Sequence, residues 1–254
     1  MAADLTEDAA LGGRLRLKQP KRGHRVGHDA ILLAAACPLQ TGERAVDLGA
    51  GVGAAGLALA VRVDGARVTL IEVDAELVAL AADNIRANGL AARVDAVALD
   101  AAAPARAFAA AGLGPESVAR ILMNPPFNDP AAGRPSPDRR RRLAHVAPDG
   151  TLPAWIRTAA RLLRPRGTLS MIWRADGLVD VLRALSPAFG AATVLPIHPR
   201  PGDAAIRVLV RATKASRAPL ALLPGLVLND HAGRPTAEAE AVLRAGTPLP
   251  LGEL

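Results

Sequence analysis

The sequence contains no tyrosine, a single cysteine and only 2% aromatic residues among its 254 residues. The lone Cys37 excludes an internal disulfide framework and favours a reducing compartment. The scarcity of aromatic side chains excludes a broad stacking platform for unpaired bases. Any base stacking would therefore fall on a few residues, chiefly Phe127.

Long apolar runs are also missing. Hydrophobic residues make up 50% of the chain, but many of them are alanine, and no stretch reaches the roughly 20 apolar residues of a membrane-spanning helix. The first ten residues are acidic and lack the basic-then-apolar pattern of a secretory signal. We therefore expect a cytoplasmic protein without a membrane partner.

Positive charge is in excess, with a formal net charge of +7. Such a balance favours a polyanionic partner such as a nucleic acid, although a chain rich in alanine and arginine can also reflect a GC-rich genome. Basic residues gather in residues 11–25 and in the run Arg139, Arg140, Arg141 and Arg142. The run has no apolar period, so it predicts an exposed loop or helix start, and a solvated charged face is the alternative.

Short apolar runs alternate with helical patterns, which predicts an α/β fold built on a parallel sheet. The expected strands span residues 44–48, 67–71, 94–99, 118–123, 168–173, 192–197 and 206–212. No repeat or low-complexity linker divides the chain, so residues 1–254 are expected to form a single domain. Within it we expect an N-terminal extension with a basic segment and a helix (1–40), a core (41–213) and a C-terminal hairpin-helix appendage (214–254).

The first core strand runs into Asp47 and then Gly49, Gly51 and Gly53. Glycines at a strand-to-helix turn let a ligand approach the backbone closely. The next two strands end at Glu72 and Asp100, and Glu72 follows the glycines by about 20 residues, as a ribose-binding acid does. Acids repeated along one sheet edge indicate a nucleoside ligand. Residues 51–56 also match the dinucleotide-binding fingerprint, so an NAD-binding protein is an alternative.

The strand over residues 118–123 ends at Asn124-Pro125-Pro126-Phe127. The first proline disfavours a helical Asn124, which holds this side chain at the carboxyl edge where α/β proteins bind ligands. The side-chain oxygen of Asn124 and the carbonyl of Pro125 form a pair of acceptors suited to a planar NH₂ group. Phe127 can stack on the ring that carries this group. By itself, the tetrapeptide also fits an ordinary strand-ending turn.

Residues 26–29 read as a turn with Asp29 as the N-cap of a buried helix over residues 30–36. His28 has no second ligand at metal-binding spacing, so we expect no metal site. The sequence does not fix the function of either residue.

The Asp-x-Gly-x-Gly-x-Gly of residues 47–53, followed by Glu72, Asp100 and residues 124–127, resembles the class I S-adenosylmethionine-dependent methyltransferases. The Asn-Pro-Pro-aromatic tetrapeptide is similar to that of the amino-methyltransferases. Residues 26–33 and 226–230 resemble the two ends of the bacterial valine-tRNA adenine-N6 methyltransferases. That family usually has a small residue in place of His28 and commonly tyrosine in place of Phe127.

This resemblance implies a Rossmann-like, seven-stranded, mostly parallel sheet and S-adenosylmethionine as the cofactor. It assigns the cofactor's methionine part to Gly49, Gly51 and Gly53, its amino group to Asp47, its ribose to Glu72 and its adenine amino group to Asp100. Asn124, the Pro125 carbonyl and Phe127 would hold the target amine.

The implied activity is methylation of an exocyclic amine, with adenine N6 in tRNA as the first candidate. Arg139 to Arg142 would then contact RNA phosphates beside a flipped base. A protein-glutamine methyltransferase uses the same tetrapeptide but carries a helical N-terminal domain for which this chain is too short. The sequence also leaves open a DNA adenine methyltransferase, for which we find no separate target-recognition domain, and a non-catalytic RNA-binding module.

Overall fold

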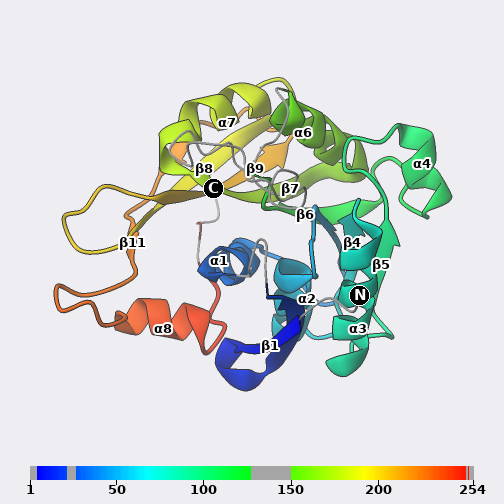
Figure 1. Ribbon diagram of the computed structural model, residues 1–254. Helices are drawn as coiled ribbons and strands as arrows, with labels where there is room; N and C mark the ends of the chain where they lie inside the picture. The colour runs from blue at the N-terminus through cyan, green and yellow to red at the C-terminus, as the bar shows by residue number, and fades with distance from the viewer. Residues whose placement is uncertain (1–4, 22–26, 127–149, 250, 252–254) are drawn as a thin grey trace, which may run out of the picture.

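The computed structural model describes residues 5–21, 27–126, 150–249 and 251. Its main sheet has nine strands with helices on both faces (Figure 1). The strands are β3 (Arg44–Leu48), β4 (Arg67–Glu72), β5 (Val94–Ala98), β6 (Val118–Met123), β7 (Leu163–Arg174), β8 (Phe189–His198), β9 (Arg207–Lys214), β10 (Ala221–Leu222) and β11 (Leu226–Val227). The helices are α1 (His28–Ala36), α2 (Ala54–Arg62), α3 (Ala75–Ala87), α4 (Ala105–Ala110), α6 (Thr151–Leu162), α7 (Leu178–Leu185) and α8 (Ala237–Leu243).

The sheet order is β10-β8-β9-β7-β6-β3-β4-β5, with β11 also paired to β8. Strands β5, β4, β3, β6 and β7 are parallel, whereas β9 lies antiparallel between β7 and β8. The predicted α/β class and mostly parallel sheet are therefore confirmed. Seven strands form the body of the sheet, and the two-residue strands β10 and β11 extend its edge.

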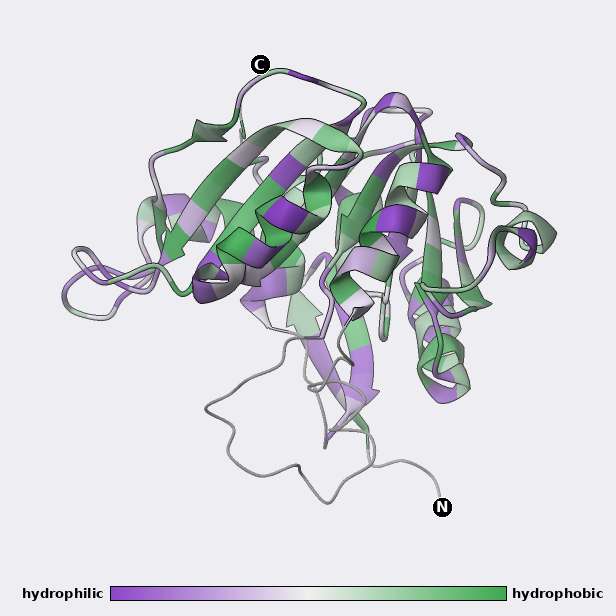
Figure 2. Ribbon diagram, turned by 90° about the horizontal axis from the view of Figure 1, so that it is seen from above, coloured by the Kyte–Doolittle hydropathy of each residue, from purple (hydrophilic) through white to green (hydrophobic). Residues whose placement is uncertain are grey.

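Two apolar clusters fill the space on either side of the sheet. One includes side chains of α1, α2 and α3, and the other includes side chains of α4, α6 and α7. Hydrophobic residues accordingly follow the strands and the helices beside them (Figure 2). No helix in the described part of the chain is long and apolar enough to cross a membrane.

The C-terminal segment has a short antiparallel bridge between Asn229 and Pro235 just before α8, but its two short strands do not form a hairpin with each other. Strands β10 and β11 each pair in parallel with β8 rather than with each other. Pro224 and Gly225 separate the two, and proline lacks the N–H that a continuous ladder requires. One extended segment therefore lies along β8 in two pieces before Thr236 caps α8 by accepting from the Ala239 amide at 3.1 Å.

An acidic N-terminal strand, β1 (Leu5–Ala10), was not expected from the sequence. It pairs antiparallel with β2 (Leu15–Pro20), where Leu15 and Leu17 are buried. Arg16 and Lys18 alternate with them and are exposed, so β2 has one buried, apolar face and one solvent-exposed, basic face.

Two asparagines, Asn84 within α3 and Asn88 directly after it, attach this hairpin to the domain. Asn84 accepts from the Lys18 amide at 2.8 Å and donates to its carbonyl at 3.0 Å. Asn88 makes the same pair of bonds to Arg16, at 2.9 and 2.7 Å. Four helical residues rise about 6 Å and two strand residues about 6.8 Å, so the spacings match. The side-chain amides thus take the place of a neighbouring strand.

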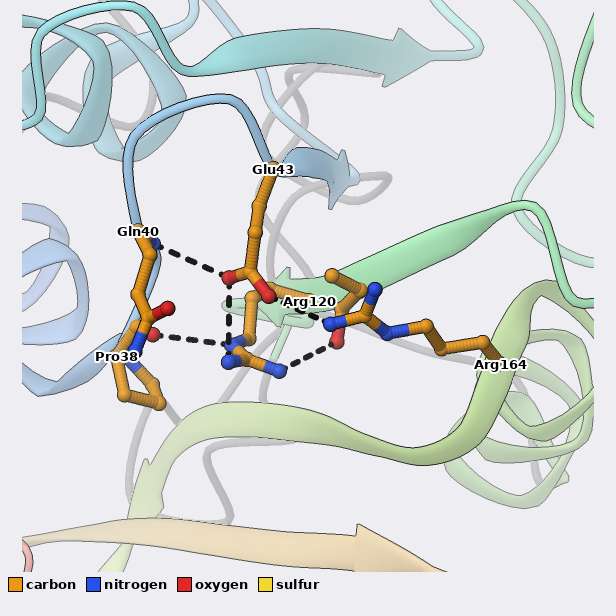
Figure 3. A network of polar contacts seen from close by, with 6 residues as sticks. Pro38, Gln40, Glu43, Arg120 and Arg164 are labelled. Atoms are coloured by element: carbon orange, nitrogen blue, oxygen red, sulfur yellow. Dashed lines mark hydrogen bonds and ion pairs between the residues drawn. The ribbon is translucent and has the colours of Figure 1, made fainter.

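An ion-pair network joins strands at the edge of the sheet where the parallel strand β3 begins (Figure 3). The Glu43 carboxylate pairs with Arg120 at 3.1 Å and with Arg164 at 2.6 Å. The Arg120 Nε also donates to the Pro38 carbonyl at 3.0 Å, and the Gln40 amide donates to Glu43 at 3.1 Å. The Glu43 and Arg120 side chains are only 13% and 12% exposed, whereas that of Arg164 is 52% exposed.

This difference in burial predicts unequal effects of removing the two arginines. Arg120→Ala leaves the Glu43 carboxylate without its buried partner and should lower the free energy of unfolding by about 3 kcal/mol. Arg164→Ala removes a solvent-screened partner of the same carboxylate and should cost no more than about 1 kcal/mol. Urea unfolding of both variants tests this, and equal losses would contradict it.

Candidate active site

The ends of four parallel strands meet along one edge of the sheet. Leu48 is in register with Met123, so Gly49 and Asn124 follow at neighbouring strand ends. The Gly49 amide donates to the Ile71 carbonyl at 2.8 Å, immediately before Glu72, and the Leu99 amide donates to the Glu72 carbonyl at 2.9 Å. Asp100, Glu72, Gly49 and Asn124 therefore lie in line across three strand spacings, or roughly 14 Å.

The glycine turn has the backbone shape that the sequence predicted. The φ angles of Gly49, Gly51 and Gly53 are +73°, +58° and +91°. Residues other than glycine rarely adopt such values. A Cβ at Gly53 would lie 2.8 Å from Leu70, whereas a Cβ at Gly51 would meet none of the described residues within 4 Å. Gly51 therefore faces open space in which a ligand can approach the backbone.

Asp47 lies beneath this turn. It is only 2% exposed, and its Oδ2 accepts from the Gly56 amide at 2.8 Å in the first turns of α2. Burial raises the pKa of Asp47 to about 7, opposed by the Gly56 hydrogen bond and assisted by the charge of Glu72. The carboxylate holds α2 against β3, and its predicted contact with a cofactor's amino group stays a prediction.

Gly56, the last glycine of the match to the dinucleotide-binding fingerprint, has a packing role. A Cβ at this position would collide with the Leu70 side chain and lie 3.2 Å from Val68. A glycine is needed here because α2 packs closely on β4, which is the role that the third glycine of such motifs has. The match over residues 51–56 therefore reflects helix-sheet packing and does not require a pyrophosphate.

Glu72 is half-buried and shapes the turn from the neighbouring strand. Its Oε2 accepts from the Gly51 amide at 2.8 Å, and its Oε1 accepts from the amides of Val73 and Asp74 at 2.8 and 3.0 Å. A carboxylate has about four acceptor positions, so it can still accept from a ligand hydroxyl. Ribose binding by Glu72 stays a prediction that this geometry permits.

Asp100 differs from the other two acids because it is exposed. Its Oδ1 accepts from the Ala102 amide at 2.8 Å, and no hydrogen bond among the described residues involves its Oδ2. The carboxylate is thus accessible at the end of β5, where the sequence predicted a contact to an adenine amino group.

Asn124 has a buried side-chain oxygen with no hydrogen-bond partner among the described residues. An unsatisfied buried acceptor costs about 1–3 kcal/mol, so this oxygen is well suited to a ligand N–H. Pro125, which follows it, is buried. Phe127 and Arg139, Arg140, Arg141 and Arg142 lie outside the described residues.

The expectation that Asp29 caps α1 is wrong. Gly27 occupies the cap position without a side-chain hydrogen bond, and the Asp29 Oδ2 instead accepts from Arg207 Nε at 2.9 Å. Arg207 begins β9, so the ion pair ties α1 to the carboxyl edge of the sheet. The partner is 178 residues away in sequence, and no local pattern could have identified it. His28 beside it is exposed.

The sequence reading also missed Trp155 of α6, whose indole lies over Gly49. The only available signal was its rarity, because the chain has just two tryptophans. Among the residues that the structure describes, no group of three or more His, Cys, Asp or Glu side chains is arranged to hold a metal.

The raised pKa of Asp47 predicts an unusual pH dependence. From about pH 4 to pH 7 the folded protein binds more protons at this carboxyl than the unfolded chain, so the free energy of unfolding falls as pH rises. Asp47→Asn keeps an oxygen for the Gly56 amide without the charge. Relative to wild type, it should gain up to about 4 kcal/mol between pH 4 and pH 8. Urea unfolding at several pH values tests this, and parallel profiles would contradict it.

Comparisons with known proteins identify the family and the fold of this chain. Residues 24–198, well over half of the chain, match the family model described as the methyltransferase small domain. A crystal structure from Agrobacterium tumefaciens, described as a predicted O-methyltransferase, has 32% sequence identity and a TM-score of 0.73, covering 87% of this chain and 97% of that one. A SAM-dependent O-methyltransferase of Thermotoga maritima, at 20% identity and a TM-score of 0.53, shares the fold.

Two curated relatives are similar over part of their length. A tRNA1(Val) (adenine(37)-N6)-methyltransferase of Tolumonas auensis is 29% identical over 160 residues, 63% of each chain. A release factor glutamine methyltransferase of Chlorobaculum tepidum is 33% identical over 156 residues, 59% of this chain and 52% of the relative. This chain therefore spans between half and two thirds of the length of these relatives.

The sheet order and these similarities confirm the predicted class I methyltransferase fold and agree with the predicted cofactor, S-adenosylmethionine. By contrast, the classic dinucleotide-binding sheet, with strand order 3-2-1-4-5-6, has no counterpart of β9, the antiparallel strand between β7 and β8. The chain belongs to the methyltransferase small domain family.

Proposed function

We propose that this protein transfers a methyl group from S-adenosylmethionine to N6 of adenine in tRNA. The observation that carries the proposal is the buried Asn124 oxygen next to the glycine turn, which has no hydrogen-bond partner in the part of the chain that the structure describes. An exocyclic NH₂ group offers two hydrogens, which suit the Asn124 oxygen together with the Pro125 carbonyl. The Tolumonas auensis relative, named as an adenine-N6 methyltransferase of tRNA, supports this choice of amine.

S-adenosylmethionine supplies an electrophilic methyl group, so the protein's contribution is alignment. Glu72 accepts from the ribose hydroxyls, and Gly51 leaves open space for the rest of the cofactor. At the adjacent strand end, Asn124 accepts from the target amine and turns its lone pair toward the methyl group. The nitrogen releases its proton readily once it is methylated, so the residues need not include a general base.

The net charge of +7 supports an RNA substrate. In this proposal Arg139, Arg140, Arg141 and Arg142 contact the phosphates that flank an adenine flipped out of its stack. The exposed Arg16 and Lys18 of β2 add positive charge on the N-terminal hairpin. A tRNA substrate also fits the cytoplasmic location expected from the sequence.

The second candidate is methylation of a protein glutamine. Its carboxamide also presents an NH₂ group, and the Chlorobaculum tepidum relative carries that name. The two candidates share Asn124 and the cofactor site and differ in the macromolecule recognised, so a choice of substrates in one assay separates them.

We expect the purified protein to form N6-methyladenosine in unmodified tRNA when S-adenosylmethionine is present, as detected by mass spectrometry of digested tRNA. Asn124→Ala should lower turnover by about 10²–10³, as does loss of one preorganised polar group, while cofactor affinity changes only a few-fold. Methylation of release-factor glutamine and not of tRNA would establish the second candidate. Near-normal turnover by the variant would exclude the role of Asn124.

Glu72→Ala should weaken S-adenosylhomocysteine binding at least tenfold, since charge-assisted hydrogen bonds contribute about 1.5–3 kcal/mol. The variant should also unfold at a lower temperature, because three backbone amides lose their acceptor.

Asp74→Ala is the control for this loss of stability. Asp74 caps α3 by accepting from the Glu76 amide at 2.9 Å, so its removal should cost about 1 kcal/mol without weakening cofactor binding. Calorimetric titration of both variants tests the assignment. Wild-type affinity in Glu72→Ala would contradict it.

A further inference from the structure

Trp155 covers the glycine turn from the side of α6. A Cβ built on Gly49 would collide with the Cη2 atom of the Trp155 indole and would lie 2.6 Å from its Cζ3 atom. The ring therefore rests directly on the glycine backbone. Gly49 is kept free of a side chain twice over, by its φ of +73° and by this contact.

The indole lies where the two halves of the proposed site meet. Gly49 directly follows β3 and Asn124 directly follows the adjacent strand β6, where Leu48 and Met123 are in register. Trp155 itself is partly buried and packs against the apolar cluster that includes Leu48 and Met123. Its ring is thus supported by the same strands that present the glycine turn and the target-binding amide.

At Gly51 the turn is open, because a Cβ there would meet no described residue within 4 Å. Glu72 is fixed next to Gly51 by the bond from the Gly51 amide. A ligand on this turn is therefore bounded by an aromatic side chain at Gly49 and by a carboxylate at Gly51. A rigid indole contributes a large apolar surface at a low cost in conformational entropy.

We propose that Trp155 is a positioning residue that forms one wall of the cofactor site. The inference rests on the proposed function, because it takes S-adenosylmethionine as the ligand of the glycine turn. The indole excludes the ligand from the space above Gly49 and directs it toward Gly51 and Glu72. Its contribution is to cofactor binding, and it takes no part in proton transfer.

The composition of the chain allows a direct optical test. There is no tyrosine, and Trp155 and Trp173 are the only tryptophans. Trp173 is a matched control because it also packs over a glycine near the end of a strand: a Cβ at Gly177 would lie 2.9 Å from its Cδ1. Trp173 belongs to β7, which is two strands from β3, so the axes of these two strands lie about 10 Å apart.

Tryptophan emission should be followed during titration with S-adenosylhomocysteine. We expect a change in the wild type and in Trp173→Phe, where Trp155 is the only tryptophan, and none in Trp155→Phe. In calorimetric titrations, Trp155→Leu should weaken binding about tenfold, equivalent to ~1.4 kcal/mol, whereas Trp173→Leu should stay within about threefold of wild type. Thermal unfolding of each variant establishes that it is folded.

The outcomes separate the inference from the function it rests on. If the wild type shows no calorimetric binding of S-adenosylhomocysteine, both fail. If it binds but the emission change persists in Trp155→Phe, Trp155 does not form a wall of the cofactor site, and the proposed function is unaffected. Tighter binding by Trp155→Leu would also overturn the wall, because the indole would then occupy the cofactor's own space. If Trp155→Leu does not fold, the emission of the two phenylalanine variants decides.

Discussion

Two hydrogen bonds from backbone amides to carboxylates fix the glycine turn on which the site depends. Asp47 accepts from Gly56 beneath the turn, and Glu72 accepts from Gly51 at its outer side, each at 2.8 Å. Both acceptors come from neighbouring parallel strands, so the sheet itself sets the shape of the turn. Because the chain's own residues make these bonds, they hold the turn in its shape, and such preorganisation favours affinity.

The turn is also held from α3, which connects it to the N-terminal hairpin. Asn84 is fully buried and donates to the carbonyls of both Val52 and Lys18, each at 3.0 Å. One side-chain amide thus joins the glycine turn to β2. Loss of this amide would leave backbone groups of two segments unsatisfied at once, so the hairpin is part of the framework of the site although it precedes the core in sequence.

The sequence predicted those elements whose signals are local. Residues 44–48 and 118–123 match β3 and β6 residue for residue, because each apolar run ends at a clear breaker, glycine or proline. Strand β1 has no such pattern, and its pairing depends on β2 and thus on the asparagines of α3. Strands β10 and β11 likewise pair with β8 rather than with each other, and this long-range pairing has no local signal in the sequence. Trp155 and the partner of Asp29 became recognisable only through tertiary contacts.

The three strand-end acids look equivalent in sequence, yet burial gives them different functions. Asp47 is enclosed and its pKa is raised to about 7, Glu72 is half-buried with three amide donors, and Asp100 is exposed. Spacing alone cannot distinguish these environments, because it places all three at the same edge. The exposure of these side chains therefore increases from Asp47 beneath the turn, through Glu72, to Asp100 beyond the end of β5. The innermost acid therefore maintains the turn, while the outer two keep acceptor positions that a nucleoside can use.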